Sequence, residues 1–146
     1  MHIRSADTTD LSTVRHLLQA AELPSEGLED QFGPGYALAI EGDRTVGAAG
    51  VERYGRWGLL RSVVTAPEWR GRGVGEALVR NRLAWADTEG LEAVYLLTTT
   101  AARYFPRLGF EPVERDLLPL EIRESREFSG ICPSTAVAMR CPRRSG

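Results

Sequence analysis

The stretch Arg70-Gly71-Arg72-Gly73-Val74-Gly75 lies between an apolar run, 59–64, and a helical run that begins near Val74. A strand, a glycine-rich turn and a helix start, in that order, bring the free N–H groups and the positive dipole end of a helix to one place. Glycines let a ligand approach the main chain closely, and arginine donates charge-assisted hydrogen bonds to phosphate oxygens. The stretch therefore predicts a phosphate-binding loop.

The spacing within this loop excludes two common nucleotide sites. A Walker loop ends in Gly-Lys-Ser/Thr, and this chain has no lysine, since all 18 of its basic residues are arginine. A dinucleotide fingerprint needs glycine or alanine at position 76, where the chain has Glu76. The pattern that remains is Arg-x-x-Gly-x-Gly.

That pattern resembles the acyl-CoA pyrophosphate loop of the GNAT acetyltransferase superfamily. The flanking segments are similar as well: 63–69 before the loop, 77–79 after it, then 95–100, and 101–110 with its Leu-Gly-Phe turn. The resemblance covers about 2–141 and implies an α/β (α+β) fold with one central, mixed, mostly antiparallel twisted sheet and helices on both faces. It also implies acetyl-CoA as the co-substrate.

A narrower resemblance extends toward the C-terminus. Residues 96–100, 105, 108–110 and 127–139 are similar to the small arsenic-resistance N-acetyltransferases, and the Cys-Pro-Ser-x-Ala-Val run at 132–137 favours that group. The same residues are similar to the acetyltransferase domain of N-acetylglutamate synthase. The first resemblance implies a detoxification enzyme, and the second implies acetylation of glutamate.

Composition indicates one soluble domain over residues 1–146. Hydrophobic residues make up 42%, charged residues 26%, and the formal net charge is −2, which gives no general attraction for nucleic acid. We expect no membrane association and a cytoplasmic location, since Met1 is followed by no apolar leader. Cys132 and Cys141 are expected to be free thiols, with no metal site.

The hydrophobic pattern predicts alternating strands and helices. We expect a first helix capped by Thr8 or Asp10 and ended by Pro24, and a short helix or ordered turn over 25–32. The expected strands are 2–6, 35–40, 45–54, 57–65, 93–98, 110–114 and 135–141, and the other expected helices are 74–86, 101–108 and 119–128. The tail from Pro142 is expected to fray.

The residue inventory favours direct acyl transfer. Nucleophilic catalysis by serine or cysteine needs a nearby base, and neither His2 nor His16 lies in the half that carries the loop. A thioester is already activated, so transfer to an amine requires positioning, oxyanion stabilisation and proton management.

The GNAT resemblance assigns roles along the chain. The main chain of Val63, Val64 and Thr65 would hold the pantetheine arm, and one of these N–H groups would polarise the acetyl carbonyl. Thr98 takes the place of an asparagine beside the cofactor. Phe105 stands at the cofactor site where many members have the tyrosine that protonates the leaving thiolate. Tyr104 lies one residue earlier, about 100° around a helix, and is a candidate acid.

Two charged residues are candidates for acceptor chemistry. Glu52 is the candidate base, directly or through a water, with a surface carboxylate paired to Arg53 or Arg61 as the alternative. Arg61 lies in an apolar strand and needs an anionic partner, either Glu52 or a substrate group. We hypothesise that Arg61 binds a carboxylate or oxyanion of the acceptor.

Together these observations predict an N-acetyltransferase for the amine of a small amino-acid-like acceptor, connected with resistance to arsenic or another toxic analogue. Two alternatives remain: an N-acetylglutamate synthase-like enzyme and a non-catalytic acyl-CoA-binding module. A homodimer is possible by analogy with the superfamily.

Overall fold

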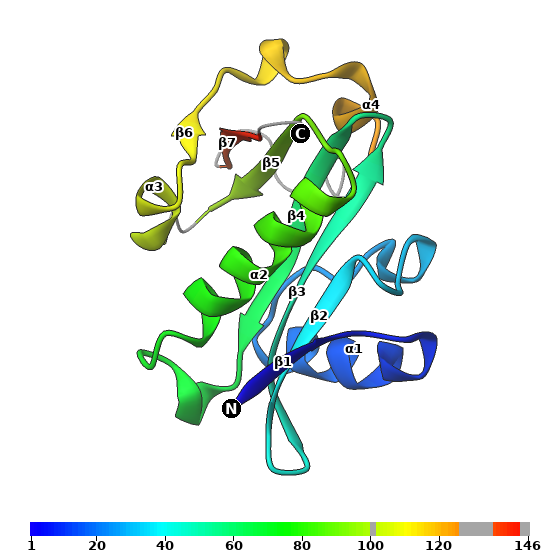
Figure 1. The fold of residues 1–146 in the computed structure, drawn as a ribbon, viewed down its shortest axis with the longest axis vertical. Helices are drawn as coiled ribbons and strands as arrows, with labels where there is room; N and C mark the ends of the chain where they lie inside the picture. The colour runs from blue at the N-terminus through cyan, green and yellow to red at the C-terminus, as the bar shows by residue number, and fades with distance from the viewer. Residues whose placement is uncertain (100–101, 126–135, 144–146) are drawn as a thin grey trace.

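The computed structural model describes residues 1–99, 102–125 and 136–143, which form a seven-stranded sheet in the order β1-β2-β3-β4-β5-β7-β6 (Figure 1). The strands are β1 His2–Ser5, β2 Tyr36–Glu41, β3 Arg44–Tyr54, β4 Trp57–Thr65, β5 Ala93–Thr98, β6 Glu111–Pro112 and β7 Val137–Pro142. The α-helices are α1 Leu11–Ala20, α2 Val74–Thr88, α3 Tyr104–Arg107 and α4 Leu120–Arg123. Only β4 and β5 pair in parallel among these strands, so the predicted mixed, mostly antiparallel sheet is confirmed.

The two long helices cover opposite faces of the sheet. Val14 and Leu18 of α1 pack on Leu38 and Val64, all of them buried. On the other face α2 runs along β3 and β4 (Figure 1) and buries its own apolar side. This second core contains Val74, Leu78, Val79 and Leu83 from α2, Ala37, Ala39, Ala49 and Val51 from β2 and β3, and Leu60, Val94 and Leu96 from β4 and β5. Helices on both faces were predicted and are confirmed.

The small side chains of β3 admit two large neighbours. A Cβ on Gly47 would lie 2.9 Å from Val74 Cγ1 and 3.0 Å from Leu78 Cδ1, so this glycine lets α2 approach the sheet. A Cβ on Gly50 would collide with the ring of Tyr36. The space that the sequence predicted against this strand is therefore filled by α2 on one face and by Tyr36 on the other.

The parallel pairing of β4 and β5 is short. It runs from Trp57↔Ala93 to Leu60↔Leu96, while β4 continues against β3 as far as Thr65↔Gly47 and β5 continues against β7 as far as Thr98↔Val137. Beyond Leu60 and Leu96 each strand pairs only with its outer neighbour. A gap in the ladder therefore opens toward the end of β4.

A β-bulge marks the start of this gap. Pairing shifts by one residue between Gly50↔Arg61 and Ala48↔Val64, so that Ser62 and Val63 oppose Ala49 alone. Ser62 has a φ of 60°, a left-handed conformation that is unusual for serine. Bulges bend a strand and increase its twist, which re-aims the residues that follow.

Several short elements differ from the prediction. The helix expected over 101–108 is α3, four residues long, because Gly109 at a φ of 99° ends it and residues 100–101 lie outside the described residues. The strand expected over 110–114 shortens to Glu111–Pro112, since Pro112 offers no N–H to a ladder. The helix expected over 119–128 is described as Leu120–Arg123, with 126–128 outside the described residues.

Pro142 and Arg143 make specific contacts, so the expected fraying is wrong for these two residues, and 144–146 lie outside the described residues. Pro142 pairs with Ala93 at the end of β7. Arg143 donates two hydrogen bonds of 2.8 Å to the Asp87 carboxylate of α2. Cys141 is a buried free thiol, and Cys132 lies outside the described residues.

Candidate active site

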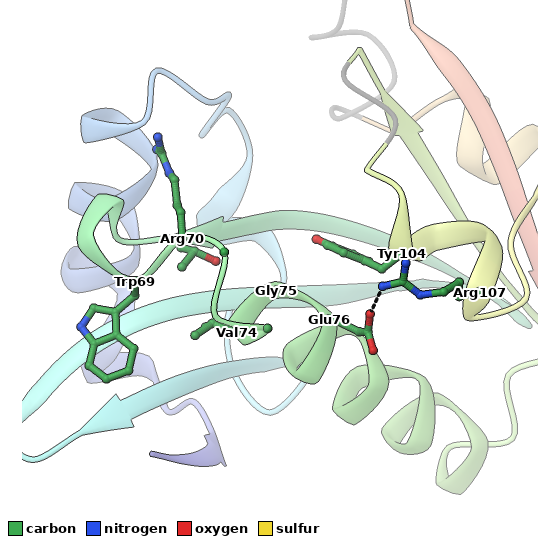
Figure 2. Close-up of a pocket in the computed structure, with 10 residues that line it drawn as sticks. Trp69, Arg70, Val74, Gly75, Glu76, Tyr104 and Arg107 are labelled. Atoms are coloured by element: carbon green, nitrogen blue, oxygen red, sulfur yellow. Dashed lines mark hydrogen bonds and ion pairs between the residues drawn. The ribbon is translucent and has the colours of Figure 1, made fainter.

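A hollow of about 300 Å³ lies at the N-terminus of α2 (Figure 2). Three segments form it: the end of β4, the loop that leads to α2 with the first helical turn, and α3. The lining residues are Thr65, Trp69, Arg70, Gly71, Gly73, Val74, Gly75, Glu76, Tyr104 and Arg107. The phosphate-binding loop predicted from sequence therefore lines a hollow, as such a site requires.

The loop leaves the helix start without a side-chain cap. Gly73 occupies the N-cap at a φ of 81°, and Gly71 has a φ of 78°, both in the left-handed region that favours glycine. Since glycine has no side chain, nothing at the N-cap position accepts from the first N–H groups of α2. These donors and the positive end of the helix dipole are available to an anion in the hollow.

Charges around the hollow favour an anionic ligand. Glu76 lies in the first turn of α2 but pairs with Arg107 at 2.5 Å and with Arg80 at 3.0 Å, and hydrogen bonds from these two arginines lower the pKa of Glu76. The three side chains together carry one net positive charge. Arg70 is exposed and extends away from α2 in Figure 2, while Arg72 stacks over the Trp69 ring at 4.8 Å.

Tyr104, and not Phe105, faces the hollow. The Tyr104 hydroxyl lies 2.8 Å from the position that a Cβ on Gly75 would take, and Figure 2 shows it directed toward the loop. Burial, and then the charge of Glu76, raises the pKa of Tyr104. Phe105 is 6% exposed and packs edge-on against Phe110. Phe105 was expected at the cofactor, but its ring lies in the core and does not line the hollow.

Val63, Val64 and Thr65 lead from the bulge to the hollow. Val64 is buried under α1, Val63 is half-buried between the cores on the α2 side, and Thr65 lines the hollow. The Ala66 N–H donates to Val46 O of β3 at 2.8 Å, and Val64 pairs with Ala48 in the same register. Because amide directions alternate along a strand, Thr65 and Val63 direct their main-chain groups to the β5 side, where the ladder is open.

Thr98 ends β5 across this gap. It is half-buried and pairs with Val137 of β7. Thr98 lies on the β5 side of the gap, and Val63 and Thr65 lie on the β4 side. Of the residues predicted to hold a cofactor, the hollow is lined by Thr65, Arg70, Gly71, Gly73, Val74 and Gly75, and not by Val63, Val64, Arg72, Thr98 or Phe105.

Glu52 and Arg61 form a buried ion pair that lies apart from the hollow. Their side chains are 2% and 1% exposed, and Arg61 Nη1 lies 3.5 Å from Glu52 Oε2. Of the two partners considered for Arg61, the structure therefore provides Glu52. The alternative reading of Glu52 as a surface carboxylate is wrong, although the proposed pairing with Arg61 is correct.

Two tyrosines complete this buried cluster. Tyr36 donates to Glu52 Oε2 at 2.7 Å and Tyr54 donates to Glu52 Oε1 at 2.8 Å. Burial, followed by the charge of Glu52, raises the pKa of Tyr36 and of Tyr54 well above the ordinary tyrosine value. Sequence reasoning missed both tyrosines, as it missed Trp69 and Arg107. Only the long-range pairing of β2 with β3 brings Tyr36 over Gly50, and no local pattern signals that contact.

A sequence profile comparison decides the family. The profile of the Acetyltransferase (GNAT) family matches residues 4–110, which include the end of β1, the strands from β2 to β5, the loop and α3. The chain belongs to the GNAT acetyltransferase family. GNAT enzymes use acetyl-CoA, and the uncapped helix start, the glycines and the arginines around this hollow are the groups that a pyrophosphate requires.

Similar proteins of this GNAT domain include amino-acid acetyltransferases. The amino-acid acetyltransferase of Proteus mirabilis is 30% identical over 132 residues, which cover 82% of this chain and 29% of that protein. N-acetylglutamate synthase of Neisseria gonorrhoeae, in complex with coenzyme A and N-acetyl-glutamate, superposes with a TM-score of 0.81 at 20% identity. That superposition covers 98% of this chain and 35% of the synthase chain, so the GNAT domain spans about a third of these longer proteins.

A second solved structure matches over its whole length. The Rv2747 protein of Mycobacterium tuberculosis, in complex with CoA and NLQ, superposes with a TM-score of 0.79 at 22% identity, covering 99% of this chain and 100% of that one. At these identities the two structures establish the fold. Within the described ranges 1–99, 102–125 and 136–143, no helix of this GNAT domain has the length and apolarity to cross a bilayer.

Proposed function

We propose that this GNAT domain transfers acetyl from acetyl-CoA to the amine of a small amino-acid-like acceptor. One observation carries the proposal: the hollow at the uncapped α2 N-terminus begins at Thr65, the end of the strand whose pairing with β5 has stopped at Leu60. A phosphate site and an open strand edge, joined by one stretch of main chain, suit an extended thioester that carries a diphosphate.

The loop would hold the diphosphate of the donor. The first N–H groups of α2 and the main chain of 70–75 supply neutral donors, while Arg70, Arg72 and Arg107 supply positive charge. The main-chain groups of Val63 and Thr65 face the open edge, and an N–H in that row is suited to polarise a carbonyl. Val64 contributes by fixing the strand in the core under α1.

Acetyl-CoA would supply the activated acyl group, so this chain needs to provide positioning and proton transfer. Tyr104 is the candidate acid because its hydroxyl reaches the hollow and can donate a proton there. Thr98 stands across the gap as a candidate polar contact. Glu52 does not line the hollow and is engaged by Arg61, Tyr36 and Tyr54, which favours a structural role for it over that of a base.

An amino acid is the acceptor class that the relatives favour. The Proteus mirabilis enzyme is an amino-acid acetyltransferase that aligns with 82% of this chain. The connection with arsenic resistance rests on the sequence resemblance, and most of the Cys-Pro-Ser-x-Ala-Val run that favours it, 132–135, lies outside the described residues. We therefore include toxic amino-acid analogues in the acceptor screen described below and do not propose them as the acceptor.

The test is an acceptor screen. Purified protein is mixed with acetyl-CoA and a panel of amino acids, including glutamate, and of arsenic- and phosphorus-containing analogues, and free thiol release is followed. We expect turnover with an amino-acid-like acceptor. Arg70→Ala should raise the KM for acetyl-CoA about tenfold through lost charge-assisted hydrogen bonds. Arg56→Ala, an exposed arginine paired with Glu92, should leave that KM unchanged.

Each result decides between the alternatives. Thermal stabilisation by coenzyme A without turnover on any acceptor would favour the non-catalytic acyl-CoA-binding module. Turnover confined to glutamate would favour the synthase-like enzyme. No calorimetric signal with coenzyme A at all would contradict the donor site itself.

A further inference from the structure

The guanidinium of Arg61 joins three parts of the chain. Its Nη1 pairs with Glu52 of β3 at 3.5 Å, and its Nη2 donates to the Glu26 carbonyl at 2.8 Å, in the connection between α1 and β2. Its Nε donates to Ser62 Oγ at 3.3 Å, at the bulge of β4. The planar fork of arginine presents its donors in fixed directions, whereas a lysine ammonium on its flexible stem does not reproduce that geometry.

A buried ion pair of this kind is weak evidence for stability. Removing two charges from water costs several kcal/mol per ion, and apolar residues of similar volume often stabilise a core as well. Among the described residues, every buried side-chain nitrogen and oxygen has a hydrogen-bond partner, so the cluster is fully satisfied. A polar cluster whose members are all hydrogen-bonded favours one arrangement of the chain segments that carry it. We therefore interpret the Arg61 cluster as a structural constraint on these segments.

The arrangement fixed by Arg61 lies where β4 and β5 separate. Arg61 directly follows Leu60, the last residue of β4 that pairs with β5, and precedes Ser62 in the bulge. On the other side, the Glu26 carbonyl precedes Gly27, which has a φ of 73°, and Leu28, which is fully buried. Arg61 thus fastens the 25–28 turn to the strand at the inner end of the gap.

We propose that Arg61 is a positioning residue, oriented by Glu52, that holds the 25–28 turn against the bulged strand and so shapes the acceptor side of the active site. Arg61 is placed to act through the turn and not on the acceptor itself, because its side chain is 1% exposed and one donor on each of its three nitrogens already has a partner in Glu52, Glu26 or Ser62. The proposal rests on the proposed function, since the acceptor must reach the inner end of the gap. This proposal takes the place of our sequence-based hypothesis that Arg61 binds a carboxylate of the acceptor directly.

The main test uses Arg61→Lys, which keeps a charge for Glu52 but loses the fork. Hydrogen exchange should become faster in peptides that cover 22–32 and stay unchanged in α2. With an acceptor found by the screen, the acceptor KM should rise about tenfold to a hundredfold, since small misplacements in an active site have effects of that size. The acetyl-CoA KM should stay within about twofold.

Two further variants keep the test decisive. Gly27→Ala strains the same turn without touching the ion pair, so it should raise the acceptor KM alone even if Arg61→Lys folds poorly. Arg143→Lys, a matched change at the Asp87 contact, should alter neither KM nor exchange at 22–32. An acceptor without a carboxylate separates positioning from direct binding, because a positioning defect affects both acceptors equally.

The results would overturn the proposal in two ways. Unchanged exchange at 22–32 in Arg61→Lys would show that Arg61 does not hold the turn, and this readout needs no turnover. A KM defect restricted to acceptors that carry a carboxylate would show that Arg61 binds the acceptor directly. Absence of turnover in the wild-type protein would instead contradict the proposed function and leave the exchange result to decide the role of Arg61.

Discussion

Gly73 and Gly75 lie two residues apart and meet different physical needs. Gly73 has a left-handed φ of 81° with open space around a would-be Cβ. Gly75 is helical, but a Cβ there would lie 2.8 Å from the Tyr104 hydroxyl. The first glycine is required by backbone conformation and the second by the space beside the hollow.

Alanine at Gly73 should therefore lower stability, whereas alanine at Gly75 should weaken ligand binding. Gly73→Ala places an L-residue in the left-handed region and should cost about 1–2 kcal/mol of folding free energy. Gly75→Ala gains helix propensity of about 0.5–1 kcal/mol, which offsets the contact with Tyr104, so stability should change little. Coenzyme A binding should weaken about tenfold in Gly75→Ala, because the Tyr104 ring is pushed into the hollow.

Denaturant unfolding and calorimetric titration with coenzyme A measure the two effects separately. Adding Tyr104→Phe to Gly75→Ala removes the colliding hydroxyl and should restore most of the affinity. A Gly75→Ala protein that binds coenzyme A as tightly as the wild type would contradict the arrangement of Tyr104 over this helix turn.

Sequence reasoning reached some of these residues and missed others for physical reasons. Motif spacing placed the loop correctly, because a strand, a glycine turn and a helix start are local features. It placed Phe105 at the hollow, where the structure has Tyr104, since the side-chain direction in a four-residue helix depends on how the helix packs. Tyr36 and Tyr54 reach Glu52 through strand pairing, which a local pattern cannot show.

At the scale of elements, the bulge in β4 depends on a residue in a costly conformation. Ser62 at a φ of 60° is held by its neighbours, among them the Nε of Arg61. Ser62→Gly and Ser62→Ala both remove the hydroxyl, but only glycine relieves the backbone. We expect the glycine variant to be more stable than the alanine variant by about 1 kcal/mol.

Chemical denaturation of the two variants under identical conditions tests whether the glycine variant is the more stable one. Both variants lack the hydroxyl, so its loss cancels in the comparison. Equal stabilities, or a more stable alanine variant, would mean that position 62 does not keep its left-handed conformation in solution. The wild-type protein provides the reference for the contribution of the hydroxyl itself.

The long elements were predicted closely and the short ones were not. Apolar periodicity located α2, which extends to Thr88, two residues beyond the expected end, and the strands from β2 to β5. The shift of register at Ser62 leaves no mark in the composition of β4, so the gap between β4 and β5 could not be read from it. Elements of two to four residues, such as α3 and β6, are set by their contacts instead of by periodicity.

At the scale of the whole molecule, an ion pair joins Arg143, which follows β7, to α2. Arg143 holds the Asp87 carboxylate with two hydrogen bonds, and these bonds lower the pKa of Asp87 from its ordinary value of 3.8. A carboxyl group with a lowered pKa stabilises the fold above its unfolded pKa and loses that effect as the pH falls through its folded pKa. Because the Asp87 side chain is 40% exposed, solvent screens the pair.

Asp87→Asn should therefore be slightly less stable than the wild type at neutral pH, by at most about 1 kcal/mol. The difference should disappear as the pH falls through the lowered pKa of Asp87, since the wild-type carboxyl is then protonated too. Thermal unfolding of both proteins from neutral to acidic pH measures it, and salt near 1 M should reduce it. A difference that grows toward acid would contradict the pairing.

The open ladder between β4 and β5 has a consequence for unfolding. Four residue pairs between β4 and β5 join the strands β1–β4 to the strands β5, β7 and β6. Beyond these pairs, the two groups of strands are in contact through side chains. A molecule bound along that opening would bridge both sides and favour the folded state by mass action. The resistance of this domain to heat should then rise with the concentration of its own donor, so that a cell rich in the donor keeps more of the protein intact.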